Sequence, residues 1–243
     1  MEAGPEGGGR VEVMAVVVGV RAAAEPRGVG NVSSEISSAE RRKVTSAIKK
    51  AEKATSGEIV VIAARQSDDY IHVPLHIATA MALAVPLILP LVSGLFPWSS
   101  FPISWVFLLQ LLVFIVAAVI LGLAPLRYAL TPKRLMRKYA HRYAAAQFLA
   151  VNLHGTGGRT GVLIFVSLLE RHCEVIADIA IAKQVSHRSW QEIIDAMLPL
   201  LRAGHTADAL VLAVSRCGII LAEHFPPGAP NPNELSDHFI VLE

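Results

Sequence analysis

The sequence predicts an α/β protein, in which helices cover a small mixed β-sheet, with an inserted two-helix transmembrane hairpin. The hairpin is indicated by the segment from Val73 to Leu126, which contains no Asp, Glu, Lys or Arg and can hold two spans of about 20 residues each. Apolar, β-branched runs at 58–65 and 161–167 are typical of strands covered on both faces. Ser-x-x-Glu patterns at 37–40 and 189–192 are capping boxes, which indicate helix starts.

The first half of the α/β part contains one helix and one strand before the apolar segment. We expect the helix from Ser37 to about Ala54, where Thr55-Ser56-Gly57 ends it and the strand at 58–65 begins. After the apolar segment, Thr131-Pro132 is suited to cap and start a helix that reaches about Leu153.

The second half contains a strand pair and two helices. The strand at 161–167 and a run at 173–180 are expected to pair antiparallel, which places Asp178 near the end of the second strand. An amphipathic helix then begins at the 189–192 box and ends at Gly204, and another runs from about Thr206 to His224.

Four regions follow from this order of elements. Residues 1–36 form a Gly-, Pro- and Ala-rich lead that we expect to be disordered, and Met14 is a possible alternative initiator. The α/β domain consists of 37–70 and 127–225, and the hairpin occupies 71–126, with spans at about 73–95 and 103–126. Residues 226–243 are expected to form a loosely held tail.

Basic residues flank the apolar segment and predict its orientation. Arg127, Lys133 and Arg134 follow the second span, and positive residues near span ends are retained in the cytoplasm. Trp98 and Trp105 suit the membrane interface, with the Trp98 loop on the opposite side. We therefore expect an integral protein of a bacterial inner membrane, with the α/β domain and both termini cytoplasmic. The basic flank fits the lipid bilayer and its anionic headgroups, rather than nucleic acid.

The chain has only two cysteines, Cys173 and Cys217, and they are isolated from each other in the sequence. One lies in an expected strand and the other in an expected helix. We interpret them as buried thiols rather than as a disulfide or a metal framework.

An ordered set of motifs resembles the TPM domain family. These motifs are Thr55–Val61, Arg159–Ser167, Glu170-Arg171 before Val175–Asp178, and Trp190. The resemblance covers about Ala39 to His224 apart from the hairpin. Within the family, the sequence resembles a bacterial branch of membrane proteins. The family includes a thylakoid-lumen factor associated with photosystem II repair, an auxiliary protein of a nematode acetylcholine receptor, and plant members described as acid phosphatases.

Charged residues near the strand ends are the candidates for chemistry. Glu58 and Asp178 are expected near one edge of the sheet, where two carboxylates could hold a divalent cation that activates water. The alternative is that both are rim acids that bond turn amides. Arg159, Glu170 and Arg171 could bind an anionic group, or they could stabilise turns and surface ion pairs.

The sequence also contains a second candidate metal site, with less support than Glu58 and Asp178. Asp68, His72 and His76 are spaced by four residues, as ligands on one helical face would be. Pro74 favours a helix that starts at the proline and leaves His72 outside it. Interfacial polar residues therefore explain the three side chains better.

Two functions remain open from the sequence. The first is a non-enzymatic, membrane-anchored protein whose cytoplasmic α/β domain binds or helps to assemble another membrane component. The alternative is a metal-assisted phosphatase that acts at the membrane surface through Glu58 and Asp178. Small residues, Gly94 and Gly122, would also allow two hairpins to approach each other.

Overall fold

The structure is a computed structural model that describes residues 36–92, 102–155, 158–228 and 239–242. Two compact units are present, one within Met1–Ser67 and Arg137–Glu243 and the other within Asp68–Met136. The expected disordered lead, apart from Ile36, lies outside the described residues, as do Met14, Gly94 and the loop that contains Trp98.

A four-stranded mixed sheet forms the centre of the first unit, in the order β3-β2-β1-β4. β1 (Glu58–Ala64) pairs parallel with β2 (Gly161–Ser167), and β2 pairs antiparallel with β3 (His172–Ala177). The predicted α/β class and the predicted strand pair are therefore confirmed. The fourth strand, β4 (Phe239–Leu242), pairs parallel with β1, so the end of the tail is an edge strand and not a loose extension.

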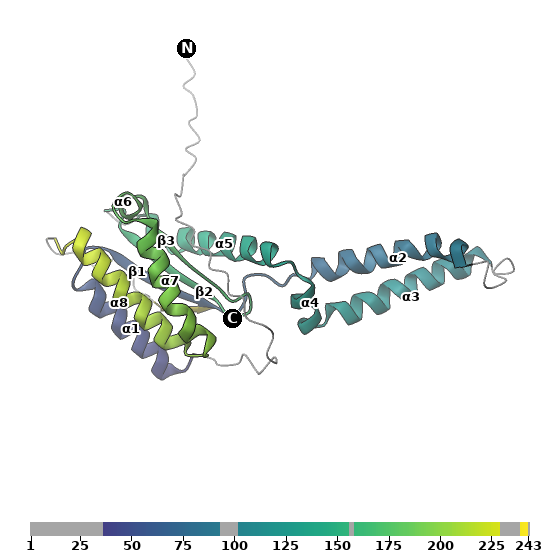
Figure 1. The fold of residues 1–243 in the computed structure, drawn as a ribbon, viewed down its shortest axis with the longest axis horizontal. Coiled ribbons are helices and arrows are strands. Elements are labelled where there is room, and N and C mark those ends of the chain that lie inside the picture. The colour runs from purple at the N-terminus through teal and green to yellow at the C-terminus, as the bar shows by residue number, and fades with distance from the viewer. Residues whose placement is uncertain (1–35, 93–101, 156–157, 229–238, 243) are drawn as a thin grey trace, which may run out of the picture. The chain divides into compact units, whose positions relative to one another are not determined.

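Helices cover both faces of this sheet (Figure 1). The face that carries Ile59 and Val61 packs against one group of helices, and the face that carries Val60 and Ile62 packs against α5 from Arg137 onward. This two-sided burial explains why the strands are continuously apolar. The helices on the face of Ile59 and Val61 are α1 (Ser38–Glu52), α6 (Ile179–Ala182), α7 (His187–Arg202) and α8 (Thr206–His224). On the other face, α5 (Lys133–Ala150) is followed by the 3₁₀ turn η2 (Leu153–Gly155).

The helix starts agree with the sequence at one capping box and differ at the other. Ser37 caps α1, because its hydroxyl accepts from the Glu40 amide and the Glu40 carboxylate accepts from the Ser37 amide. The capping box predicted at 189–192 is wrong. Ser186 is the N-cap of α7, and its hydroxyl accepts from the Ser189 amide at 3.3 Å. Ser189 is therefore in the first turn of a helix that begins at His187.

The second hairpin strand is shorter than the predicted run of 173–180. It ends at Ala177 because the Asp178 carboxylate accepts from the Ile179 amide at 2.6 Å and caps the short helix α6. Asp178 therefore follows the strand directly, whereas the sequence analysis had placed it inside the strand near its end.

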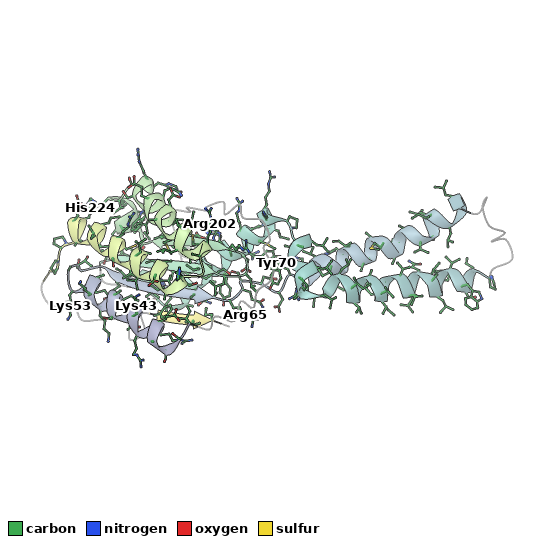
Figure 2. All side chains as sticks on the ribbon, turned by 60° about the horizontal axis from the view of Figure 1, so that its bottom comes forward. Lys43, Lys53, Arg65, Tyr70, Arg202 and His224 are labelled. Atoms are coloured by element: carbon green, nitrogen blue, oxygen red, sulfur yellow. The ribbon has the colours of Figure 1, made fainter. Side chains whose placement is uncertain are left out.

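The second unit is a helical hairpin of α2 (His72–Val92) and α3 (Ile103–Gly122), followed by α4 (Ala124–Leu130). Both long helices have the length and composition to cross a membrane, and only 17% and 6% of their apolar windows are buried. In Figure 2 their side chains consist almost entirely of carbon, whereas Lys43, Lys53 and Arg202 mark the charged surface of the other unit.

Two helix boundaries in the hairpin differ from the expectation. α2 begins at His72, because Pro74 occupies its first turn, where a missing amide hydrogen costs no helical bond. His72 is thus inside the helix, and its carbonyl lies 2.6 Å from His76 Nδ1. Helix α3, which corresponds to the second expected span, ends at Gly122 and not at 126, because Leu123 is extended and Ala124-Pro125 starts a new helix.

Candidate functional site

Two predicted acids lie at the sheet edge where β1 and β2 start and β3 ends. Glu58 is paired in register with Gly161, and the Asp178 amide donates to the Gly161 carbonyl at 2.9 Å. Gly161 therefore lies between the two acids. Strand alternation places Glu58 on the face of Val60 and Asp178 on the face of Ile176, which is the same face. Their exposed fractions are only 4% and 7%.

The residue between these acids has to be small. A Cβ atom at Gly161 would lie 2.8 Å from the Leu153 carbonyl oxygen and 2.9 Å from Leu153 Cδ2. The close approach of η2 to the start of β2 thus requires glycine, and the carbonyl and side chain of Leu153 occupy the space that a side chain at position 161 would fill.

Glu58 has a carboxyl partner that the sequence analysis missed. Glu52, at the end of α1, is hydrogen-bonded through its side chain to Glu58 and accepts from the Ile59 amide at 3.1 Å. The pKa of Glu52 is raised to about 7, mainly by burial and also by the Glu58 carboxyl, while the hydrogen bond from the Ile59 amide opposes the shift. The two carboxyl groups can therefore hold one proton between them near neutral pH.

Asp178 uses only one of its carboxylate oxygens. Oδ1 caps α6, whereas Oδ2 is buried and has no hydrogen-bond partner among the described residues. A buried, unsatisfied carboxylate oxygen is costly and calls for an explanation, such as a bound cation or water.

The other predicted charged residues are divided between the two ends of β2. Arg159 precedes the strand, at the end where Glu58 lies, and Glu170 and Arg171 follow it. A strand of seven residues separates them by about 20 Å, so the three do not form one anion site. Glu170 stabilises a turn, because its oxygens accept from the Ser67 amide at 2.7 Å and from the Ser167 hydroxyl. Arg159 and Arg171 both have positive φ angles, of 54° and 50°.

The side chains predicted to bind a metal ion do not supply enough ligands by themselves. Within the described ranges, no group of three or more His, Cys, Asp or Glu side chains is arranged to hold a metal ion. This includes Asp68, His72 and His76, of which Asp68 accepts from the Tyr70 amide at 2.8 Å. Glu58 and Asp178 offer the oxygen ligands that hard cations prefer, but a cation there would need further ligands from water or substrate.

The predicted interface residues that the structure describes are exposed or stacked. Trp105 lies in the first turn of α3 with 59% exposure. The Arg127 guanidinium lies 5.4 Å from the centre of the Tyr128 ring. Lys133 and Arg134 are exposed in the first turn of α5.

A buried acid in the middle of β3 forms a second cluster that the sequence analysis missed. Glu174 is fully buried, and its two oxygens lie 2.7 Å from His141 Nδ1 and 3.0 Å from His172 Nε2. If Glu174 is ionised, each imidazole donates through that nitrogen, which fixes the tautomer of a neutral ring. The cluster joins α5 to the sheet. The sequence signal was weak: His172 and Glu174 share a strand face, but His141 is 33 residues away from Glu174.

The cysteines are buried free thiols, as predicted. Burial raises the pKa of both Cys173 and Cys217 to about 12, and for Cys173 the nearby Glu174 carboxylate contributes. Neither thiol is therefore suited to act as a nucleophile at neutral pH.

Comparison with known proteins supports the resemblance. A family model described as the TPM domain matches residues 128–219. The NMR structure of the BA42 protein from the psychrophilic bacterium Bizionia argentinensis matches with a TM-score of 0.53 and 18% identity, over 86% of this chain and 97% of that chain. At this identity the likeness shows the fold alone. A comparison with curated proteins gave no match.

Proposed function

We propose that this chain is a membrane-anchored TPM-domain protein whose cytoplasmic α/β unit binds or helps to assemble another membrane component. The match of the TPM-domain model to residues 128–219 supports the family part of the proposal. The observation that carries the proposal is the hairpin α2–α3, which is inserted between β1 and α5 in the sequence and whose long apolar helices are little buried.

The exposure of the hairpin supports the bilayer as its environment. Leu87, Leu91 and Ile103 are 78%, 85% and 74% exposed, and many neighbouring side chains are similar. A continuous apolar surface of this extent would drive aggregation in water. In lipid the same surface is stable, and the backbone groups are satisfied within each helix.

The topology of the chain also suits two spans. The first unit takes its residues from both sides of the hairpin in the sequence. An even number of spans returns the chain to the side from which it left, so two crossings are compatible with one folded α/β unit. The positive charges of Arg127, Lys133 and Arg134 favour the cytoplasm for that side, and each cation near anionic headgroups would contribute about 1 kcal/mol.

The partner role is tested by purification from native membranes. The intact chain is compared with a hairpin-only chain of residues 68–136, both carrying the same tag. We expect the intact chain to retain at least one membrane protein that the hairpin-only chain does not retain. Identical sets of co-purified proteins would contradict a binding role of the α/β unit.

A second function is favoured by one observation, the two buried acids on either side of Gly161. In this alternative, Glu58 and Asp178 help to hold a divalent cation, which would polarise a phosphoryl oxygen and activate water. The orphaned Oδ2 of Asp178 and the carboxylate chemistry fit such an ion. This chain would then act as a metal-assisted phosphatase at the membrane surface.

Phosphate release by the detergent-purified intact chain tests the alternative. Metal-dependent release that is lost in Glu58→Ala and Asp178→Ala, but retained in Arg171→Ala at the other end of β2, would support it. The absence of release across divalent metals and pH values would exclude it.

A further inference from the structure

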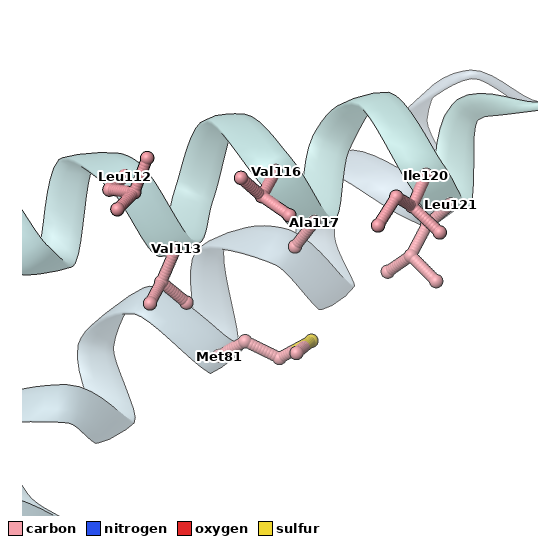
Figure 3. A pocket seen from close by; sticks show the side chains of 7 residues that line it. All are labelled: Met81, Leu112, Val113, Val116, Ala117, Ile120 and Leu121. Atoms are coloured by element: carbon pink, nitrogen blue, oxygen red, sulfur yellow. The ribbon is translucent and has the colours of Figure 1, made fainter.

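Two grooves formed by described residues of the hairpin have similar size and different chemistry. One has a volume of about 410 Å³ and is lined only by apolar side chains, among them Met81 of α2 and Leu112, Val113 and Val116 of α3 (Figure 3). The other has a volume of about 420 Å³ and contains polar side chains of both helices, Thr79 and Gln110. The two faces of the hairpin therefore differ in polarity rather than in size.

Gln110 is placed where an amide is costly. It lies seven residues after the first residue of α3, which is about 10 Å along the helix at 1.5 Å per residue. In a bilayer this depth is inside the hydrocarbon region, where no water satisfies the amide. None of the hydrogen bonds found among the described residues involves the Gln110 side chain.

The neighbouring hydroxyl does not satisfy this amide by donation. Thr79 Oγ1 donates to the Leu75 carbonyl at 2.8 Å, so its hydrogen is used within α2. The oxygen of Gln110 therefore needs a donor from outside the hairpin, and its NH₂ group needs an acceptor.

We propose that a second copy of this chain occupies the groove of Thr79 and Gln110, with the two Gln110 amides hydrogen-bonded to each other across a two-fold axis. The inference rests on the membrane anchoring proposed above. It adds a partner for the hairpin, which is distinct from the partner of the α/β unit.

The choice of a second copy follows from the chemistry of the amide. A two-fold contact places each residue opposite or near itself, and an amide carries both the donor and the acceptor that its own copy requires. The groove contains no charged residue that would call for a partner of opposite charge. The small side chain of Thr79 also allows close approach of helices, as is common at interfaces within lipid.

Disulfide cross-linking of the intact chain in alkali-washed membranes tests this pairing. Phe107→Cys places a thiol in the Gln110 groove and keeps the amide, while Val116→Cys places a matched thiol in the apolar groove. The parent chain serves as the background, because its own cysteines are both buried.

We expect oxidation to give a dimer of the Phe107→Cys chain and several-fold less dimer of the Val116→Cys chain. Adding Gln110→Leu should lower the association about tenfold, because both interhelical hydrogen bonds of the two-fold contact are lost, whereas Gln110→Asn should retain the dimer. The Asn variant controls for any general disturbance of α3.

Three other outcomes would overturn the pairing and leave the anchoring intact. In chains that remain in the membrane pellet, equal cross-linking from both grooves would mean that copies meet without a preference for the Gln110 face. Cross-linking from neither groove would mean that lipid covers this face. A cross-link to a different protein would identify another occupant. If alkali instead releases the chain from the membrane, then both the anchoring and the pairing are wrong.

Discussion

Replacing His172 in the buried Glu174 cluster should destabilise the α/β unit more than replacing His141 does. His172 is 3% exposed and His141 is 35% exposed, while Glu174 is fully buried. In His172→Ala, water cannot reach the carboxylate oxygen that loses its donor, and breaking such a buried pair costs about 3 kcal/mol. In His141→Ala, water can replace the imidazole, so the loss should be about 1 kcal/mol.

A substitution of the acid itself separates charge from hydrogen bonding. Glu174→Gln is neutral, and its amide can bond both rings because either imidazole nitrogen can donate or accept. We therefore expect its free energy of unfolding to lie within about 1 kcal/mol of the parent value. Glu174→Leu should cost more, because it leaves the buried His172 without this partner.

Urea unfolding of the detergent-purified chain measures this series. Fluorescence of the buried Trp190 reports on the α/β unit, provided that Trp98 and Trp105 are replaced by Phe in every variant. The expected order of destabilisation is His172→Ala, then His141→Ala, then Glu174→Gln. A loss for His141→Ala equal to or larger than that for His172→Ala would refute the reasoning from burial.

Three further predictions concern single positions, each read from the same unfolding assay. Because the pKa of Glu52 is raised to about 7, its contribution to stability is full below about pH 4.5 and is lost as the pH rises through 7. Glu52→Gln should remove this loss. If the free energies of unfolding of the parent and of Glu52→Gln change in parallel with pH, this prediction is wrong. Gly161→Ala should cost about 1 to 3 kcal/mol because its Cβ would meet Leu153, whereas Gly228→Ala, with open space around it in the same unit, should be near neutral; equal effects would contradict the contact. Ser37→Ala should cost about 1 kcal/mol through loss of the capping box, and no change would argue against that cap.

The elements that the sequence predicts well are those with a local signal. β1 and β2 are recognisable because burial on both faces makes them continuously apolar, and Ser37 is recognisable because a capping box needs only four residues. β4 is also apolar, but it has only four residues, and its place in the sheet depends on parallel pairing with β1, which is far away in the sequence.

The candidate site is predictable only in part, for the same reason. Strand ends placed Glu58 and Asp178 at one edge, where the structure also places them. The partnership of Glu58 with Glu52 depends on how the chain turns from α1 into β1, which no spacing rule specifies. The contact of His141 with Glu174 requires α5 to pack on the sheet, which composition alone cannot reveal.

The most direct test of the membrane-anchored account is protease digestion of the intact, C-terminally tagged chain in alkali-washed membrane vesicles of both orientations. The account predicts that the chain stays in the pellet and that the α/β unit is digested only in inside-out vesicles. Release of the chain by alkali would contradict the anchoring. Digestion only in right-side-out vesicles would contradict the cytoplasmic placement of the α/β unit.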